Sequence, residues 1–229
     1  MKDRPILFSA PMVRAILEGR KTQTRRIVKP QPEAIPVEHL YGKPPGTLWW
    51  SCRSVPLVIE QQHMPSYCPY GQRGDRLWVR EAWGLDAYTG DMQFSIKYRA
   101  GGDSYVTERN ESDEWVPIYQ RYMDGCGLDD KWDRWRPSIH MPRWASRITL
   151  EVTGVRVERL QDITEDDAKA EGAMHWWNGL PHNEQTEAYC GGVGPVGAFH
   201  SLWNSINKDR APWGSNPWVW VVGFRRMEE

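Results

Sequence analysis

The pattern of apolar and polar positions predicts that the chain opens with a strand, a helix and a second strand. "PILF" forms a short apolar run, and in "SAPMVRAILEG" the apolar residues Val13, Ile16 and Leu17 recur at i, i+3 and i+4, which is the spacing of one helix face. Gly19 stands where a left-handed residue ends a helix. "KTQTRRIV" contains β-branched residues at alternating positions and predicts a strand that leaves this cap.

The second half of the chain contains the most regular pattern. "RITLEVTGVRVERL" alternates over more than a dozen residues and predicts a strand, in which Gly154 marks a bulge or a bend. In "ITEDDAKAEG", Thr164 is a good N-cap and Gly172 a good stop for a short helix. "NPWVWVVGFRR" predicts a last strand. A helix before it has apolar residues at i, i+3, i+4 and i+7: Phe199, Leu202, Trp203 and Ile206.

Two segments rich in proline, glycine or polar residues interrupt these elements, at about 29–74 and 101–140. We expect them to be insertions with little regular structure, because long connections without periodicity are usually loops. "GDRLWVREAW" and "QFSIKYR" predict strands between them. Strands dominate and helices are too few for βαβ winding, so the pattern predicts one α+β domain over 1–229, with a mixed sheet or a small β-barrel and flanking helices.

Composition excludes several classes of protein. The 229 residues are 40% hydrophobic with a formal net charge of -1, which is typical of a globular protein and indicates no global attraction to nucleic acid. No apolar run approaches the ~20 residues of a membrane span, and no signal sequence is evident, so we expect a cytoplasmic protein without membrane contact. No cofactor is predicted. The spacing of Cys52, His63 and Cys68 does not match the usual zinc ligand pairs, and we expect no metal there.

The stretch "EGRKTQTRR" concentrates candidate chemistry. In a strand, Thr22, Thr24 and Arg26 share one face while Lys21 lies on the other. Lys21 and Thr24 therefore converge only if Lys21 belongs to the turn after Gly19, or if a bulge re-aims one of them. Three interpretations stay open from the residues alone: a charged edge strand, a grip for phosphate or a base, and a catalytic lysine–threonine pair.

"LEGRKTQTRR" resembles the signature of the ASCH family, which is related to PUA domains. Gly19, Lys21, Thr24 and Arg26 match its Gly-x-Lys-x-x-(Glu/Thr)-x-Arg motif in order. The chain is further similar to phage- or prophage-encoded members through "CPYGQRGDRLWVREAW", "HMPRWASR" and "NPWVWV". The resemblance covers about half of the chain. It implies a PUA-like fold and, for a phage protein, the cytoplasm of a bacterial host.

The small bacterial N4-acetylcytidine amidohydrolases of this family use a lysine, a threonine and a glutamate in catalysis. The resemblance implies the same roles for Lys21 and Thr24, and the segment "ITEDDAKAEG" places Glu171 in the third. A carboxylate in the last turn of a helix lies at the negative end of the helix dipole, which raises its pKa and suits an acid–base group. The implied reaction is hydrolysis of the amide of an acylated cytidine or a similar modified nucleoside.

An acylated base needs an aromatic wall and polar contacts. Trp83 or Trp144 could supply the wall by stacking, although both are equally suited to core packing. Arg26, Arg143 and Arg147 could contact a phosphate or a base edge. Glu81 is a second acid that could line the same pocket. The alternative function is a PUA-like module that binds RNA, single-stranded nucleic acid or a modified base without chemistry.

Overall fold

The computed structural model describes 1–34, 48–52, 55–58, 61–89, 93–105, 135–178 and 194–227. The chain forms two compact units. Unit 1 comprises Met1–Arg4, Ala15–Leu77 and Leu150–Glu229, and unit 2 comprises Pro5–Arg14 and Trp78–Thr149.

Five strands form one sheet in the order β1 (Asp3–Leu7), β6 (Arg76–Arg80), β10 (Thr149–Arg159), β11 (Trp218–Arg226) and β2 (Gln23–Ile27). The β10–β11 and β11–β2 pairs are antiparallel. The β1–β6 pair is parallel, since Arg76 donates to the Lys2 carbonyl and Phe8 to the Arg80 carbonyl. The mixed sheet and the α+β class are confirmed. Among the described strands the order has two ends, so they form no closed barrel.

The alternating segment forms the predicted long strand β10, which is 11 residues long. Its register against β11 shifts between Val152 and Gly154, so the bulge predicted at this glycine is confirmed. Beyond the bulge, Arg156 and Arg25 both lie opposite Val221 of the central strand β11. Side chains in one such row project from the same face of a sheet. The sheet therefore brings Arg25 and Arg156, which are far apart in sequence, to the same face.

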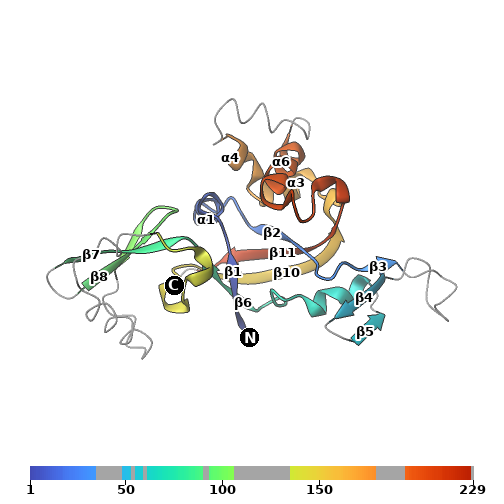
Figure 1. The fold of residues 1–229 in the computed structure, drawn as a ribbon, viewed down its shortest axis with the longest axis horizontal. Coiled ribbons are helices and arrows are strands. Elements are labelled where there is room, and N and C mark those ends of the chain that lie inside the picture. The colour runs from blue at the N-terminus through green and yellow to red at the C-terminus, as the bar shows by residue number, and fades with distance from the viewer. Residues whose placement is uncertain are drawn as a thin grey trace. The chain divides into compact units, whose positions relative to one another are not determined.

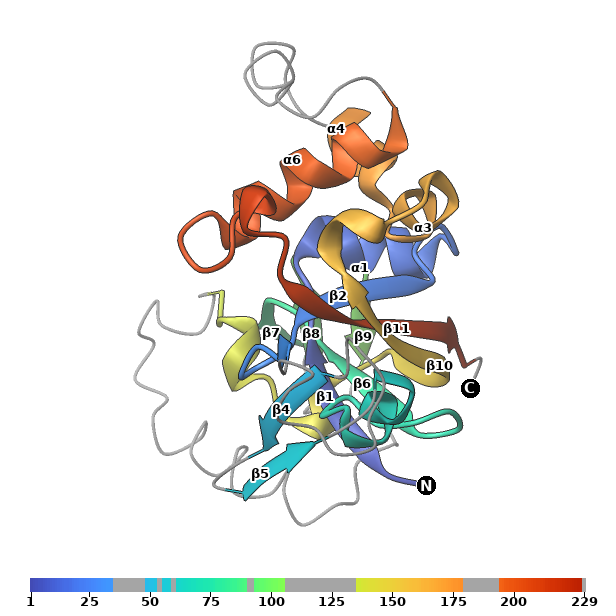
Figure 2. The ribbon, with the colours of Figure 1, turned by 90° about the vertical axis from the view of Figure 1, so that its right-hand side faces the viewer.

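Three helices of unit 1 pack together (Figure 1): α3 (Glu165–Ala170), α4 (Ala173–Asn178) and α6 (Pro195–Asn207). Figure 2 shows α3 and α6 on one side of β2, β11 and β10. Three of the four predicted core positions of α6 are buried, but Ile206 is 53% exposed. The prediction for Ile206 is wrong because the apolar face of the helix extends beyond the part that packs against the core. No helix in the described part of the chain is both long and apolar enough to cross a bilayer.

The first predicted insertion contains more regular structure than expected. A three-stranded sheet consists of β3 (Glu33–Ala34), β4 (Leu48–Cys52) and β5 (Val55–Val58), and a 3-10 helix follows at Gln61–Tyr67. The apolar runs "LWWSC" and "VPLV" form the two longer strands, which pair antiparallel with one another. Of the second insertion, 106–134 lies outside the described residues.

Unit 2 contains a three-stranded antiparallel sheet formed by β7 (Trp83–Thr89), β8 (Gln93–Tyr98) and β9 (Asp103–Tyr105). Short 3-10 helices follow at Ser138–His140 and Arg143–Ala145. Trp144 packs against a core of buried side chains: Trp83, Ile96, Tyr98, Met141 and Ala145.

Candidate functional site

Lys21 lies in the turn that follows helix α1 (Ala10–Leu17), before the next strand begins. Gly19 has φ 73°, and the backbone amides of Arg20 and Lys21 both donate to the Ala15 carbonyl, at 2.8 and 3.0 Å. Strand β2 begins only at Gln23. Lys21 therefore belongs to the turn and not to the strand. This meets the condition stated above, that Lys21 can approach Thr24 only if it lies outside the alternation of the strand.

Lys21 and Glu171 form a buried ion pair. The Lys21 ammonium donates to Glu171 Oε2 at 2.7 Å and to the Glu171 carbonyl at 2.9 Å. Glu171 is the C-cap of α3, and Gly172, with φ 75°, ends that helix. A side chain at Gly172 would meet the Cβ atoms of Ala15 at 3.3 Å and Lys21 at 3.5 Å. The glycine thus permits the close approach of turn and helix that puts the two charges in contact.

Burial is the main cause that lowers the pKa of Lys21 below its ordinary value of 10.5. The side chain of Lys21 is 0% exposed and that of Glu171 4%. The charge and hydrogen bond of Glu171 raise the pKa of Lys21, while the neighbouring cations Arg25 and Arg26 lower it. Burial and two cations outweigh one carboxylate, so this lysine loses its proton more readily than a surface lysine.

Thr24 lies on β2 opposite Val222 of β11 and is 3% exposed. Among the described residues, no hydrogen bond joins its hydroxyl to Lys21 or Glu171. Arg26 shares its strand face and is half-buried. Burial lowers the pKa of the Arg26 guanidinium, and the charges of Tyr70 and Glu171 act in the opposite direction. Arg26 is therefore within electrostatic range of the ion pair and also of Tyr70, a residue that the sequence did not single out.

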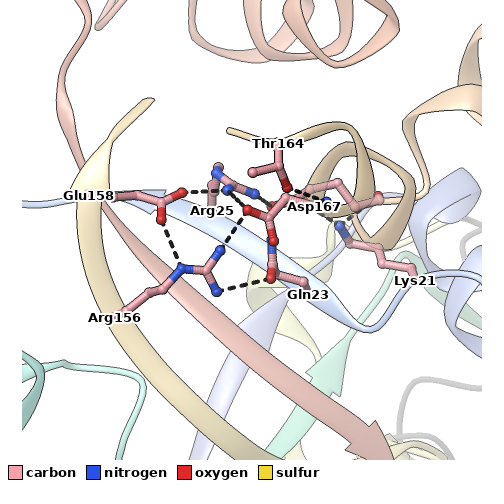
Figure 3. Close-up of polar contacts among 8 residues, drawn as sticks. Lys21, Gln23, Arg25, Arg156, Glu158, Thr164 and Asp167 are labelled. Carbon is pink, nitrogen blue, oxygen red and sulfur yellow. Dashed lines mark hydrogen bonds and ion pairs between the residues drawn. The ribbon is translucent and has the colours of Figure 1, made fainter. Parts of the chain in front are cut away.

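A ring of four charged groups, the Arg25 ring, lies next to this pair (Figure 3). Arg25 donates to Glu158 at 2.5 Å and to Asp167 at 3.0 Å. Arg156 donates to the same two carboxylates, at 2.8 and 2.7 Å. The two cations and two anions alternate and balance. Arg25 also points its second nitrogen toward Glu171 Oε1, at 3.4 Å, which connects the ring to the Lys21–Glu171 pair.

Sequence reasoning missed this ring, although part of its signal is visible in the chain. Arg156 and Glu158 stand at i and i+2 of a predicted strand, and so do Gln23 and Arg25; each pair therefore shares a strand face. Asp167 is the third acid of the first turn of α3, where the Thr164 hydroxyl accepts from its backbone N–H at 3.1 Å. What the sequence lacks is the strand order that sets these groups side by side.

Asp167→Asn is expected to remove an acid-sensitive part of the stability. Burial alone would raise the pKa of Asp167, but the hydrogen bond from Arg156 and the charges of Arg25 and Arg156 outweigh it and lower the pKa from 3.8 to about 2. A lowered carboxyl pKa stabilises the fold above the unfolded value, and this contribution is lost as the pH falls through the folded one. The substitution should therefore cost roughly 2 kcal/mol near neutrality.

The cost of Asp167→Asn should shrink between pH 4 and about pH 2. Urea unfolding of both proteins across this range measures it. Asp166→Asn is the matched control, because this neighbouring carboxylate is 94% exposed and pairs with Lys169 on the same helix; it should change little. A deficit for Asp167→Asn that stays constant from neutral pH to pH 2 would contradict the assignment.

In unit 2 the structure pairs two predicted contact residues with one another. Arg147 donates to both oxygens of Glu81, at 3.0 and 3.1 Å, and its guanidinium lies 3.9 Å from the centre of the Tyr98 ring. Glu81 is 1% exposed. Burial raises the pKa of Glu81, and the hydrogen bond and charge of Arg147 oppose that rise. Arg147 and Glu81 therefore bind one another in a bidentate ion pair within the unit.

The other predicted contact residues of unit 2 lie around its core. Trp83 is buried, with its ring edge-to-face to Trp144 at 5.8 Å and the Arg136 guanidinium 4.9 Å from its centre. This is core packing, the second of the two roles considered for Trp83. Arg143 is exposed and lies 5.9 Å from the Trp78 ring.

The described residues offer no evident metal site. Burial raises the pKa of the Cys68 thiol to about 11, so it stays protonated; the side chain of Cys52 lies outside the described residues. Within the described ranges, no three His, Cys, Asp or Glu side chains form a group that could hold a metal ion.

A hollow of about 430 Å³ opens beside β2, β10 and β11, and none of the predicted site residues line it. Its walls are Thr22, Gln23, Thr153, Gly154, Val155, Arg156, Val221, Gly223 and Phe224.

The fold and the site together define an α+β protein with a buried lysine–glutamate pair between a glycine turn and the end of a short helix. No protein-family model matches the sequence, and neither curated proteins nor solved structures match it.

Proposed function

We propose that unit 1 hydrolyses the amide bond of an N4-acylated cytidine or a similar acylated nucleoside, with Lys21, Thr24 and Glu171 as the reacting groups. The observation that supports this most strongly is the buried pair of Lys21 and Glu171, with 2.7 Å between Nζ and Oε2. The ASCH-like motif and the PUA-like character inferred from it are part of the same proposal.

A buried lysine–glutamate pair holds one proton in a short hydrogen bond. Burial lowers the pKa of Lys21, which makes its neutral amine available as a base. A proton that Lys21 takes up can pass to Glu171 across their 2.7 Å hydrogen bond, so the pair can supply both the base and the acid that amide hydrolysis requires.

In the proposed reaction the Thr24 oxygen attacks the acyl carbonyl and Lys21 takes the hydroxyl proton. The C–N bond of the tetrahedral intermediate then breaks, and the leaving amine receives a proton from Glu171. Water hydrolyses the acyl-threonine ester, which releases the carboxylic acid and restores Thr24. Each proton taken up by the pair is returned to product, so no further reactant is needed besides water.

The test is turnover of N4-acetylcytidine and related acyl-cytidines, measured as release of the free nucleoside. Thr24→Val, which keeps the shape and removes the hydroxyl, should abolish release, whereas Thr24→Ser should retain a part of it. Thr22→Val is the matched control, since Thr22 is an exposed threonine two residues away. Release by Thr24→Val at the wild-type rate would rule out the threonine as nucleophile.

A module that binds RNA or a modified base without chemistry is the second candidate. The observation that favours it is the geometry of Thr24, whose hydroxyl makes no hydrogen bond to Lys21 or Glu171 in the described structure. In that case the wild-type protein should release no nucleoside from any acyl-cytidine. It should instead bind nucleic acid with an affinity that falls as salt rises, because phosphate contacts release counterions.

A further inference from the structure

Arg25 is the group that connects the Lys21–Glu171 pair to the rest of unit 1. Its side chain is 0% exposed and contacts three carboxylates: Glu158, Asp167 and Glu171. Its guanidinium also lies 5.7 Å from the centre of the Phe199 ring, on helix α6. A planar guanidinium holds several acceptors in a fixed geometry that an ammonium cannot reproduce, so this side chain has little freedom to turn.

The Arg25 ring explains how the orientation of Arg25 is set. Glu158 accepts from Arg25 through one oxygen and from Arg156 through the other. Asp167 accepts from both arginines through the same oxygen. The ring is closed, and its charges cancel before Glu171 is counted. The contact from Arg25 to Glu171 is therefore additional to a set of ion pairs that is already complete.

The carboxylate of Glu171 is divided between two cations as a result. Lys21 occupies Oε2 at 2.7 Å, and Arg25 faces Oε1 at 3.4 Å. Asp167 and Glu171 stand four residues apart on α3, and the backbone N–H of Glu171 donates to the Asp167 carbonyl at 2.9 Å. Arg25 thus contacts both side chains of one helical turn and faces the Glu171 oxygen that Lys21 does not bind.

We propose that Arg25 is a positioning residue that orients the Glu171 carboxylate toward Lys21 and holds a positive charge beside the pair. The proposal rests on the proposed function for its catalytic meaning, but the contact and the charge are properties of the folded chain. It differs from a purely structural role, in which Arg25 would only tie α3 to the sheet. The Arg156 side chain provides the comparison, because it belongs to the same ring and does not contact Glu171.

The proton equilibrium of Lys21 separates the two roles without any substrate. The charged groups that act on it are Glu171 from α3 and Arg25 and Arg26 from β2. Arg25→Gln removes one of the two cations that lower the pKa of Lys21, so this pKa should rise above its wild-type value. Arg156→Gln opens the same ring at its far side and should leave the pKa of Lys21 close to its wild-type value, because Arg156 is not among the charges that act on Lys21.

The experiment is a pH titration of protein labelled with ¹³C-lysine, followed by NMR. The chain contains eight lysines, and Lys21→Met identifies the signal of Lys21. Equal midpoints for Lys21 in wild type and Arg25→Gln would overturn the proposal. Equal shifts in Arg25→Gln and Arg156→Gln would overturn it as well, since only one of the two arginines faces Glu171.

Turnover gives the catalytic readout. With N4-acetylcytidine, Arg25→Gln should lower kcat by about 10–100-fold with a smaller change in KM, because displaced reacting groups slow the chemical step. If Arg25→Gln does not fold, the double variants Arg25→Gln/Asp167→Asn and Arg156→Gln/Asp167→Asn repeat the comparison with one charge of each sign removed. If the wild-type protein releases no nucleoside, the proposed function fails while the titration still decides the role of Arg25.

Discussion

Lys21→Met is expected to lower the turnover of N4-acetylcytidine by roughly 10²–10⁴-fold, the usual loss when a general base is removed. Methionine fills a similar volume but cannot accept a proton. Since methionine is of similar size, the substitution should leave no large cavity at this fully buried position, and Glu171 retains its contact with Arg25. Initial rates of nucleoside release, together with thermal unfolding of the same samples, measure the effect.

Lys21→Arg and the pH profile distinguish a base from a binding charge. Arginine keeps the positive charge and stays protonated, so Lys21→Arg should be as inactive as Lys21→Met if the lysine acts as a base. Burial lowers the pKa of Lys21 below 10.5, so wild-type turnover should rise with pH and reach half of its maximum below that value. Lys29→Met, at an exposed lysine, is the control. Retained turnover in Lys21→Arg would contradict the base assignment.

Arg147→Met is expected to destabilise unit 2 by about 3–5 kcal/mol, since it leaves the buried Glu81 carboxylate without its bidentate partner. The pKa of Glu81 is already raised by burial and should rise further in the variant. A carboxyl group with a raised pKa binds its proton more tightly in the folded state, so stability falls as the pH rises above its unfolded pKa. The deficit should therefore be larger at pH 8 than at pH 5.

Urea unfolding followed by tryptophan fluorescence at the two pH values tests this expectation. Arg143→Met is the matched control in the same segment. Arg143 is exposed, and substitutions at exposed positions usually change the free energy of unfolding by less than about 0.5 kcal/mol. Glu81→Gln combined with Arg147→Met should recover much of the stability, because no buried charge is left. Similar deficits for Arg147→Met and Arg143→Met would show that the pair contributes nothing specific.

The local elements of this protein could be predicted because short-range patterns determine them. The strand β10, its bulge at Gly154, the N-cap at Thr164 and the glycine ends of α1 and α3 all follow from period, capping and glycine conformation. The strands β4 and β5 were not predicted, because a run as short as "VPLV" gives little periodicity and its flanks are rich in proline and glycine. Ile206 fits the helical period and is exposed nevertheless, since period alone does not say where the core ends.

The candidate site likewise combines features that are local in sequence with contacts between distant residues. Local signals predict a glycine turn before Lys21 and a short helix that ends at Glu171. The contact between these two side chains, 150 positions apart, and the connection through Arg25 to the ring depend on the strand order β10, β11, β2. The reason is that helix and turn signals act over a few residues, whereas contact between distant charges depends on strand order, which burial of the whole sheet selects.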